Sequence, residues 1–86
     1  MSQFLVDQYF SQEELLEMKF KKLGCNVKIS RTARLYIPEY ISIGNNSIID
    51  DFCIISGNIE IERNVHIAHG CRVVAGREGL KMHDFS

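Results

Sequence analysis

Isoleucine and valine recur along the middle of the chain at a fixed interval of six residues. The series consists of Ile43, Ile49, Ile55, Ile61, Ile67 and Val73. Neither the 3.6-residue period of a helix nor the two-residue alternation of a strand explains a strict interval of six. A short fixed period is typical of stacked coils, in which each repeat supplies one brief strand and one turn. The pattern predicts a parallel β-helix in which three hexapeptides form one triangular coil, so that residues eighteen apart stack on each other.

A second series of small or apolar residues lies four positions after most members of the first. It consists of Ser47, Cys53, Ile59, Val65 and Cys71, and Arg77 breaks it. Because side chains alternate along a strand, both series are expected to point into the coil. We therefore expect Cys53 and Cys71 to stack in the core, where a free cysteine behaves as a small hydrophobic residue.

The sequence before the repeats carries the start signal of a helix over residues 12–18. Ser11 and Glu14 have the spacing of a capping box, and Phe10 and Leu15 have that of a hydrophobic staple. Basic residues that suit the negative end of the helix dipole follow at Lys19, Lys21 and Lys22. We expect this helix to cover the N-terminal end of the β-helix, because a solenoid needs a capping element.

The repeats define about three and a half coils over residues 23–86, preceded by an N-terminal segment 1–22 that contains the capping helix. Leu23, Ile29 and Leu35 belong to the first coil. The register then slips by two residues around 37–40, where Pro38 indicates a corner, since proline donates no ladder hydrogen bond. Residues 75–79 predict a loop. Met82-His83-Asp84-Phe85-Ser86 repeats the pattern of residues 49–53 and predicts the start of a fourth coil.

Composition excludes several classes of protein. Ten basic and eleven acidic residues give a net charge of −1, which argues against a nucleic acid or a membrane surface held by charge. No apolar run reaches the length of a membrane span, and the first ten residues lack the pattern of a signal peptide. Three cysteines without a CxxC motif indicate free thiols in a reducing compartment. These features predict a cytoplasmic protein.

Several stretches of the chain resemble the hexapeptide-repeat acyltransferases, most closely the N-terminal part of sugar O- and N-acetyltransferases of polysaccharide biosynthesis. The matching stretches are Ser11-Gln-Glu-Glu-Leu-Leu, Phe20-Lys-Lys-Leu-Gly24, Ile29-Ser-Arg31, Ile41-Ser-Ile-Gly-Asn-Asn46, Ile49-Asp-Asp-Phe-Cys53, Ser56-Gly57, Asn64-Val-His-Ile-Ala68 and Met82-His-Asp-Phe-Ser86. The resemblance implies an all-β solenoid with left-handed coils, a trimeric assembly, and acetyl-coenzyme A bound between neighbouring subunits. The chain departs from the family at Lys19, where relatives often have glycine. It also lacks the further coils that carry the usual catalytic histidine.

His69 is the candidate general base. It follows inward Ile67 by two residues, and Asp51 stands eighteen residues earlier, directly across the neighbouring coil. Adjacent strands lie about 4.8 Å apart, so the Asp51 carboxylate is expected to orient the imidazole. Acetyl transfer needs a base, since the attacking hydroxyl or amine must lose a proton. The alternative is an exposed turn histidine beside an acid with no catalytic role.

A zinc site formed by His66, His69 and the partner subunit's His83 is the competing interpretation of the histidines. Catalytic zinc requires three protein ligands and an open position, and the spacing does not impose that convergence. We expect no metal, and we interpret His66 as a surface residue that points outward over Ile48.

Two functions remain open at this stage. The first is acetyl transfer from acetyl-coenzyme A to a hydroxyl or amine of a sugar or amino sugar, with His69 as base and Asp51 as its orienter. The second is a non-catalytic truncated β-helix that acts as an oligomeric scaffold or interaction module. A β-helix that stops within a coil exposes an apolar end, so trimers are expected to pair through the open C-terminal end.

Overall fold

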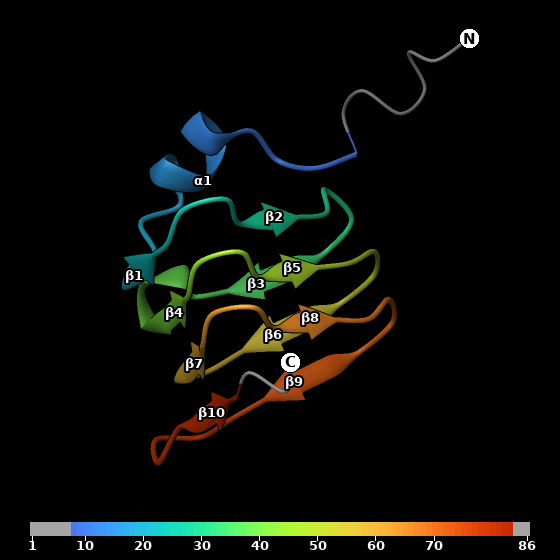
Figure 1. Ribbon diagram of the computed structural model, residues 1–86. Helices are drawn as coiled ribbons and strands as arrows, with labels where there is room; N and C mark the ends of the chain where they lie inside the picture. Colours follow the sequence, from blue (N-terminus) through green and yellow to red (C-terminus); the bar gives the residue numbers. More distant parts are fainter. Residues whose placement is uncertain (1–7, 84–86) are drawn as a thin grey trace, which may run out of the picture.

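The computed structural model describes residues 8–83, and the periodic isoleucines form three-sided coils (Figure 1). The elements follow in the order α1 (Gln12–Glu17), β1 (Lys22–Leu23), β2 (Lys28–Ile29), β3 (Arg34–Tyr36), the 3-10 turn Pro38–Tyr40, β4 (Ile41–Ile43), β5 (Ile48–Ile49), β6 (Ile54–Ser56), β7 (Ile59–Ile61), β8 (His66–Ile67), β9 (Arg72–Val74) and β10 (Leu80–Met82). Among residues 8–83 no helix has the length and apolar character needed to cross a bilayer. The stretch 84–86, which the repeats assign to the fourth coil, lies outside the described residues.

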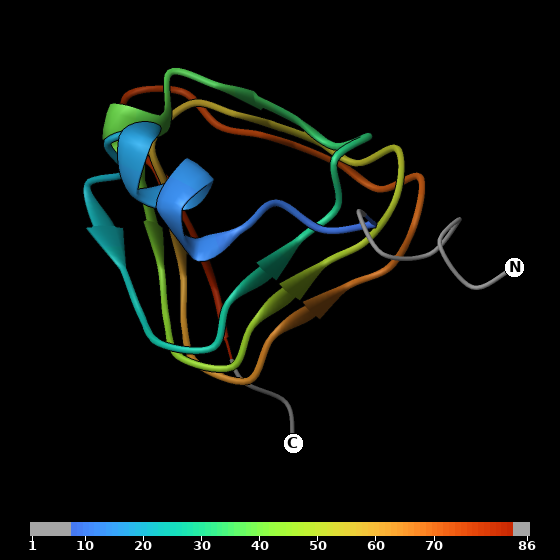
Figure 2. The same ribbon diagram turned by 90° about the horizontal axis from the view of Figure 1, so that it is seen from above.

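Three parallel sheets form the sides of a triangle (Figure 2). Their strand orders are β1-β4-β7-β10, β2-β5-β8 and β3-β6-β9. The predicted stacks are confirmed: the paired residues are Ile43 with Ile61, Ile49 with Ile67, and Ile55 with Val73. Seen from the N-terminal end, the chain runs anticlockwise as it recedes, so the coils are left-handed, against the usual hand of parallel crossovers.

Two corners contain extra residues at the places where the sequence predicted irregularities. Lys22 pairs with Ser42, twenty residues later, whereas β4 and β7 pair at an interval of eighteen. The 3-10 turn that starts at Pro38 accounts for this difference. Loop 75–79 lengthens the next coil, because Met82 pairs with Ile61. Met82 therefore continues the sheet of β7 at the position where each coil begins, which confirms the predicted start of a fourth coil.

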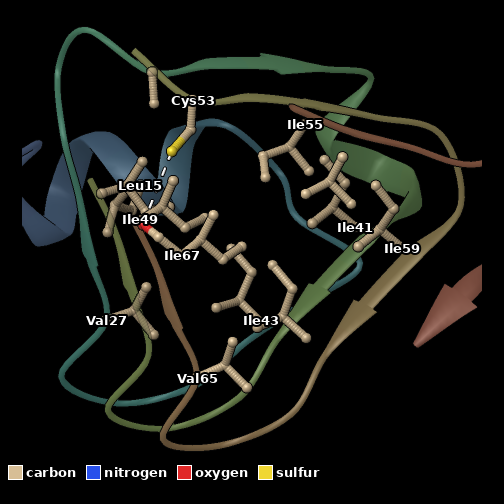
Figure 3. Packing of buried hydrophobic residues seen from close by; sticks show 14 residues of the cluster. Leu15, Val27, Ile41, Ile43, Ile49, Cys53, Ile55, Ile59, Val65 and Ile67 are labelled. Carbon is tan, nitrogen blue, oxygen red and sulfur yellow. Dashed lines mark hydrogen bonds between the residues drawn. The ribbon is translucent and has the colours of Figure 1, made fainter. Parts of the chain in front are cut away.

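The inward residues form one apolar core (Figure 3). Ile29, Ile49 and Ile55 have no exposed surface. Cys53 is buried as predicted, and burial raises the pKa of its thiol. The thiol donates to the Ala68 carbonyl at 3.0 Å, and the Ile67 carbonyl lies farther away at 3.8 Å (Figure 3). The prediction for Cys71 is wrong, because this residue is exposed. Within the described residues β8 and β9 are the last strands of their sheets, so no further strand covers Cys71.

Helix α1 has the predicted start and lies at the N-terminal end of the coils (Figure 1). Ser11 and Glu14 form both hydrogen bonds of the capping box, and Leu15 is 1% exposed within the same core as the coils. The helix ends at Glu17, one residue before the predicted end, and Lys19 lies beyond it, so no lysine lies in the last turn. Lys19 has a φ of 62°, the left-handed conformation that glycine usually supplies at a helix exit.

Candidate functional site

The two predicted site residues lie at one corner of the coil. The chain turns three corners in each coil. The second of these corners connects the sheet of β5 to the sheet of β6 and consists of residues 30–33, 50–53 and 68–71. The N–H of Gly70 donates to the Asp51 carbonyl at 2.9 Å and holds the two coils in register. Asp51 and His69, together with Asp50, Phe52 and Gln8, line a shallow cavity of about 330 Å³.

The Asp51 carboxylate is hydrogen-bonded to the preceding coil. Its Oδ1 atom accepts hydrogen bonds from the hydroxyls of Ser30 and Thr32, the latter at 3.2 Å. Within residues 8–83 no hydrogen bond or ion pair joins Asp51 to His69, although both side chains face the same cavity. Asp51 thus stabilises the corner, and its role in orienting His69 stays a prediction.

A second aspartate–histidine pair, which the sequence analysis did not identify, lies beside this corner. His66 pairs with Ile48 as expected, so its side chain lies on the outer face of the sheet. Its Nε2 atom is 2.7 Å from Oδ2 of Asp50. The signal for this contact was present in the repeat: Asp50 follows Ile48 by two residues and therefore lies diagonally across from His66.

Phe52 is the other residue that the sequence analysis passed over. Its side chain is 69% exposed and its φ is 61°, a left-handed conformation that is rare for a bulky residue. Its N–H donates to the Thr32 hydroxyl at 3.0 Å. Gly70 stands eighteen residues later with a φ of 76°, and a Cβ there would have no atom within 4 Å. The ring of Phe52 therefore borders open space at the cavity.

The histidines of one protomer do not form a metal centre. Among residues 8–83 no group of three histidine, cysteine, aspartate or glutamate side chains is placed to hold a metal ion. His83 lies against Glu62, with Nδ1 3.1 Å from Oε1.

Two larger concave surfaces lie at the other corners. One, of about 880 Å³, is lined along the sheet of β4 by residues that include Lys22, Glu60 and Arg63. The other, of about 650 Å³, is lined by residues that include Tyr40 and Arg77. Neither of these two surfaces is lined by a histidine, although Oε1 of Glu62, a residue that lines the first, lies 3.1 Å from Nδ1 of His83.

Comparison with known proteins relates this site to a family. The bacterial transferase hexapeptide family (six repeats) matches residues 40–75. A dTDP-4-amino-4,6-dideoxy-D-glucose acyltransferase of Escherichia coli is 51% identical over 63 residues, which make up 70% of this chain and 33% of that enzyme. The chain thus spans about a third of the length of this curated relative.

Solved structures give the same result. The N-acyltransferase AntD from Bacillus cereus, in complex with dTDP and 3-hydroxybutyryl-CoA, superposes with a TM-score of 0.89 and 46% identity over 93% of this chain and 43% of AntD. An AntD variant in complex with dTDP-4-amino-4,6-dideoxyglucose and coenzyme A gives a TM-score of 0.88 at the same identity and coverage. These matches confirm the predicted resemblance to the hexapeptide-repeat acyltransferases.

Proposed function

We propose that this protein takes part in acyl transfer from an acyl-coenzyme A to the amine of a nucleotide-linked amino sugar. The observation that carries the proposal is the 51% identity with a curated dTDP-amino-sugar acyltransferase. The AntD complexes, which hold coenzyme A or an acyl derivative of it, support an acyl-coenzyme A donor. Acetyl-coenzyme A is the donor that we test first, and the likeness to sugar acyltransferases disfavours a purely structural scaffold.

The chemistry assigns a definite task to the protein. The amine nitrogen attacks the thioester carbonyl, a C–N bond forms, the C–S bond breaks, and coenzyme A leaves as a thiol. The amine must give up one proton in this step, and a positioned histidine is the usual acceptor. His69 is exposed at a cavity that also contains two carboxylates, so it is accessible to an incoming amine. We assign His69 as the base and Asp51 as the residue that supports it.

The assembly that we propose is a homotrimer, in accordance with the family resemblance, in the cytoplasm. Pairing of two trimers into a hexamer is the further arrangement to be tested. Light scattering coupled to size exclusion distinguishes monomer, trimer and hexamer directly, and it is the first control for every variant described below.

The test is an acyl-transfer assay in which release of the coenzyme A thiol is followed with a chromogenic disulfide. The acceptor is dTDP-4-amino-4,6-dideoxyglucose, and the donors are acetyl-coenzyme A and 3-hydroxybutyryl-coenzyme A. His69→Ala is expected to lower kcat by about 10²- to 10⁴-fold, the usual contribution of a general base. The thermal midpoint should stay unchanged, because His69 is exposed.

His83→Ala is the matched control and should keep the wild-type rate, since it removes another exposed histidine, one that contacts Glu62 away from this cavity. Turnover of His69→Ala at the wild-type rate would contradict the assignment of the base. Absence of thiol release with either donor would contradict acyl transfer itself and favour the scaffold alternative.

A further inference from the structure

Phe52 occupies a position that the fold does not explain. It is the most exposed of the large apolar side chains in residues 8–83, and it lies outside the buried cluster. Its left-handed backbone disfavours a bulky residue, since such strained conformations persist only where the surroundings impose them. Gly70 occupies the equivalent position in the next coil with a φ of 76°, and glycine is the residue type that a left-handed conformation favours.

The carboxylates around this ring have unused hydrogen-bonding capacity. Asp51 accepts its two hydrogen bonds through Oδ1, and Asp50 contacts His66 through Oδ2. Within the described residues the other oxygen of each carboxylate makes no hydrogen bond. The cavity thus combines an exposed aromatic ring, two carboxylates with one unused oxygen each, an imidazole and the amide of Gln8.

This combination fits the chemistry of an amino sugar. A sugar ring has an apolar C–H face that packs on an aromatic ring, and an ammonium group is attracted to the face of that ring. Carboxylate oxygens accept hydrogen bonds from ammonium and hydroxyl groups. The same carboxylates repel phosphate. The cavity therefore favours the sugar and disfavours the diphosphate of a nucleotide-linked substrate and that of coenzyme A.

We propose that Phe52 is the platform on which the acceptor sugar stacks, with the amine of the sugar directed to Asp50 and Asp51. This proposal rests on the proposed function and specifies the acceptor subsite within it. Stacking on Phe52 places the amine in the cavity that contains His69. The left-handed backbone conformation of Phe52 keeps its ring at the cavity border.

The test uses the methyl glycoside of the acceptor sugar from the assay above, without nucleotide and without acyl donor. Saturation-transfer NMR from the aromatic protons identifies the contact, and titration of backbone amide shifts gives the Kd. The wild type is expected to transfer saturation to the sugar ring. Phe52→Asn is expected to raise the Kd by about fivefold, the order expected for the loss of one aromatic contact, and Phe52→Tyr to restore it.

Phe52→Asn also controls for folding, because asparagine tolerates the left-handed conformation better than phenylalanine does. A wild type that does not bind the glycoside, or a Phe52→Asn variant that binds it like the wild type, would overturn the platform. Dissociation of the assembly by Phe52→Asn would overturn it as well, since the ring would then be a subunit contact.

The two proposals fail in distinguishable ways. If the glycoside binds the wild type but not Phe52→Asn, and the assay detects no thiol release, the platform proposal stands and the acyl-transfer proposal is wrong. If thiol is released and Phe52→Asn leaves KM for the acceptor unchanged, the acyl-transfer proposal stands and the platform proposal is wrong.

Discussion

Two corners of the coil make the same turn with different residues. The first corner consists of residues 24–26, 44–46 and 62–64, and it uses asparagine in every coil. Asn26, Asn46 and Asn64 have φ values of 57°, 63° and 58°. Asparagine is the residue other than glycine that accepts this conformation most readily. The hydrogen bonds repeat too, because Asn46 and Asn64 each donate an N–H to the coil before at 2.9 Å.

The second corner changes residue type from coil to coil. Its left-handed positions are Phe52 and Gly70, and only Gly70 donates its N–H to a carbonyl of the preceding coil. Phe52 donates to the Thr32 side chain. Stability alone explains a corner that has the same residue type in every coil. It does not explain a corner at which one coil has an exposed aromatic residue in the left-handed position. The difference between the two corners therefore points to the second as the functional one.

The largest effect is expected at the first corner, from Gly44→Ala. A Cβ at this position would lie 2.5 Å from the Arg63 nitrogen and 2.6 Å from the Glu62 carbonyl carbon, both backbone atoms that cannot move away. We expect a loss of about 3 kcal/mol in the free energy of unfolding, measured by urea denaturation.

Gly70→Ala is the matched control at the second corner, where a Cβ would have no atom within 4 Å. Only its left-handed φ of 76° opposes the substitution, at a cost of about 1 kcal/mol. Equal losses for the two variants would show that the first corner is not the more tightly packed.

The next effect has opposite signs at the two corners. Asn46→Ala is expected to lower the free energy of unfolding by about 1.5 kcal/mol, because alanine resists the left-handed conformation. This substitution also removes the 2.9 Å hydrogen bond from Asn26. Phe52→Asn is expected to raise the free energy by about 0.5 kcal/mol, because it relieves the same strain. A loss of stability in Phe52→Asn would mean that the ring supports the fold, and the contrast between the corners would disappear.

The contrast also explains what the sequence predicted and what it did not. The stacking of Ile49 on Ile67 follows from the period alone, since inward positions must coincide in every coil. The Asp50–His66 pair joins positions that lie diagonally across adjacent coils, so the contact depends on rotamers that no period specifies. Likewise, burial of Cys71 depends on a covering strand and not on its own place in the repeat.

Phe52 was missed for a related reason. In the repeat it reads as one more turn residue, and its meaning emerges only from its φ and from the neighbours that line the cavity. His69 and Asp51 were predicted to share a corner, and they do. The hydroxyls that hold Asp51 come from residues 30 and 32, and a spacing of eighteen does not identify them because the first coil is two residues longer.

The smallest effect concerns a charged contact between the second corner and helix α1. Arg31 of this corner reaches Glu14 of helix α1 with nitrogen–oxygen distances of 2.7 and 3.1 Å. The hydrogen bond from the Ser11 N–H is the largest cause that lowers the pKa of Glu14 from its ordinary value of 4.5, and the Arg31 guanidinium lowers this pKa further. A carboxylate whose pKa is lower in the folded state than in the unfolded state stabilises the fold at pH values above its unfolded-state pKa. This contribution is lost as the pH falls through the folded-state pKa.

Glu14→Gln should therefore lower the thermal midpoint slightly at pH 7, and the gap to the wild type should close as the pH falls from 4.5 through the lowered pKa of Glu14 and the carboxylate protonates. The effect is small because both side chains are more than a third exposed, and such pairs are screened by solvent. Glu13→Gln, a substitution in the same helical turn at a residue without an ion pair in residues 8–83, should show no such gap. A gap that persisted after the Glu14 carboxyl had protonated would mean that Glu14 holds the helix to the second corner through hydrogen bonds that glutamine cannot replace, independently of its charge.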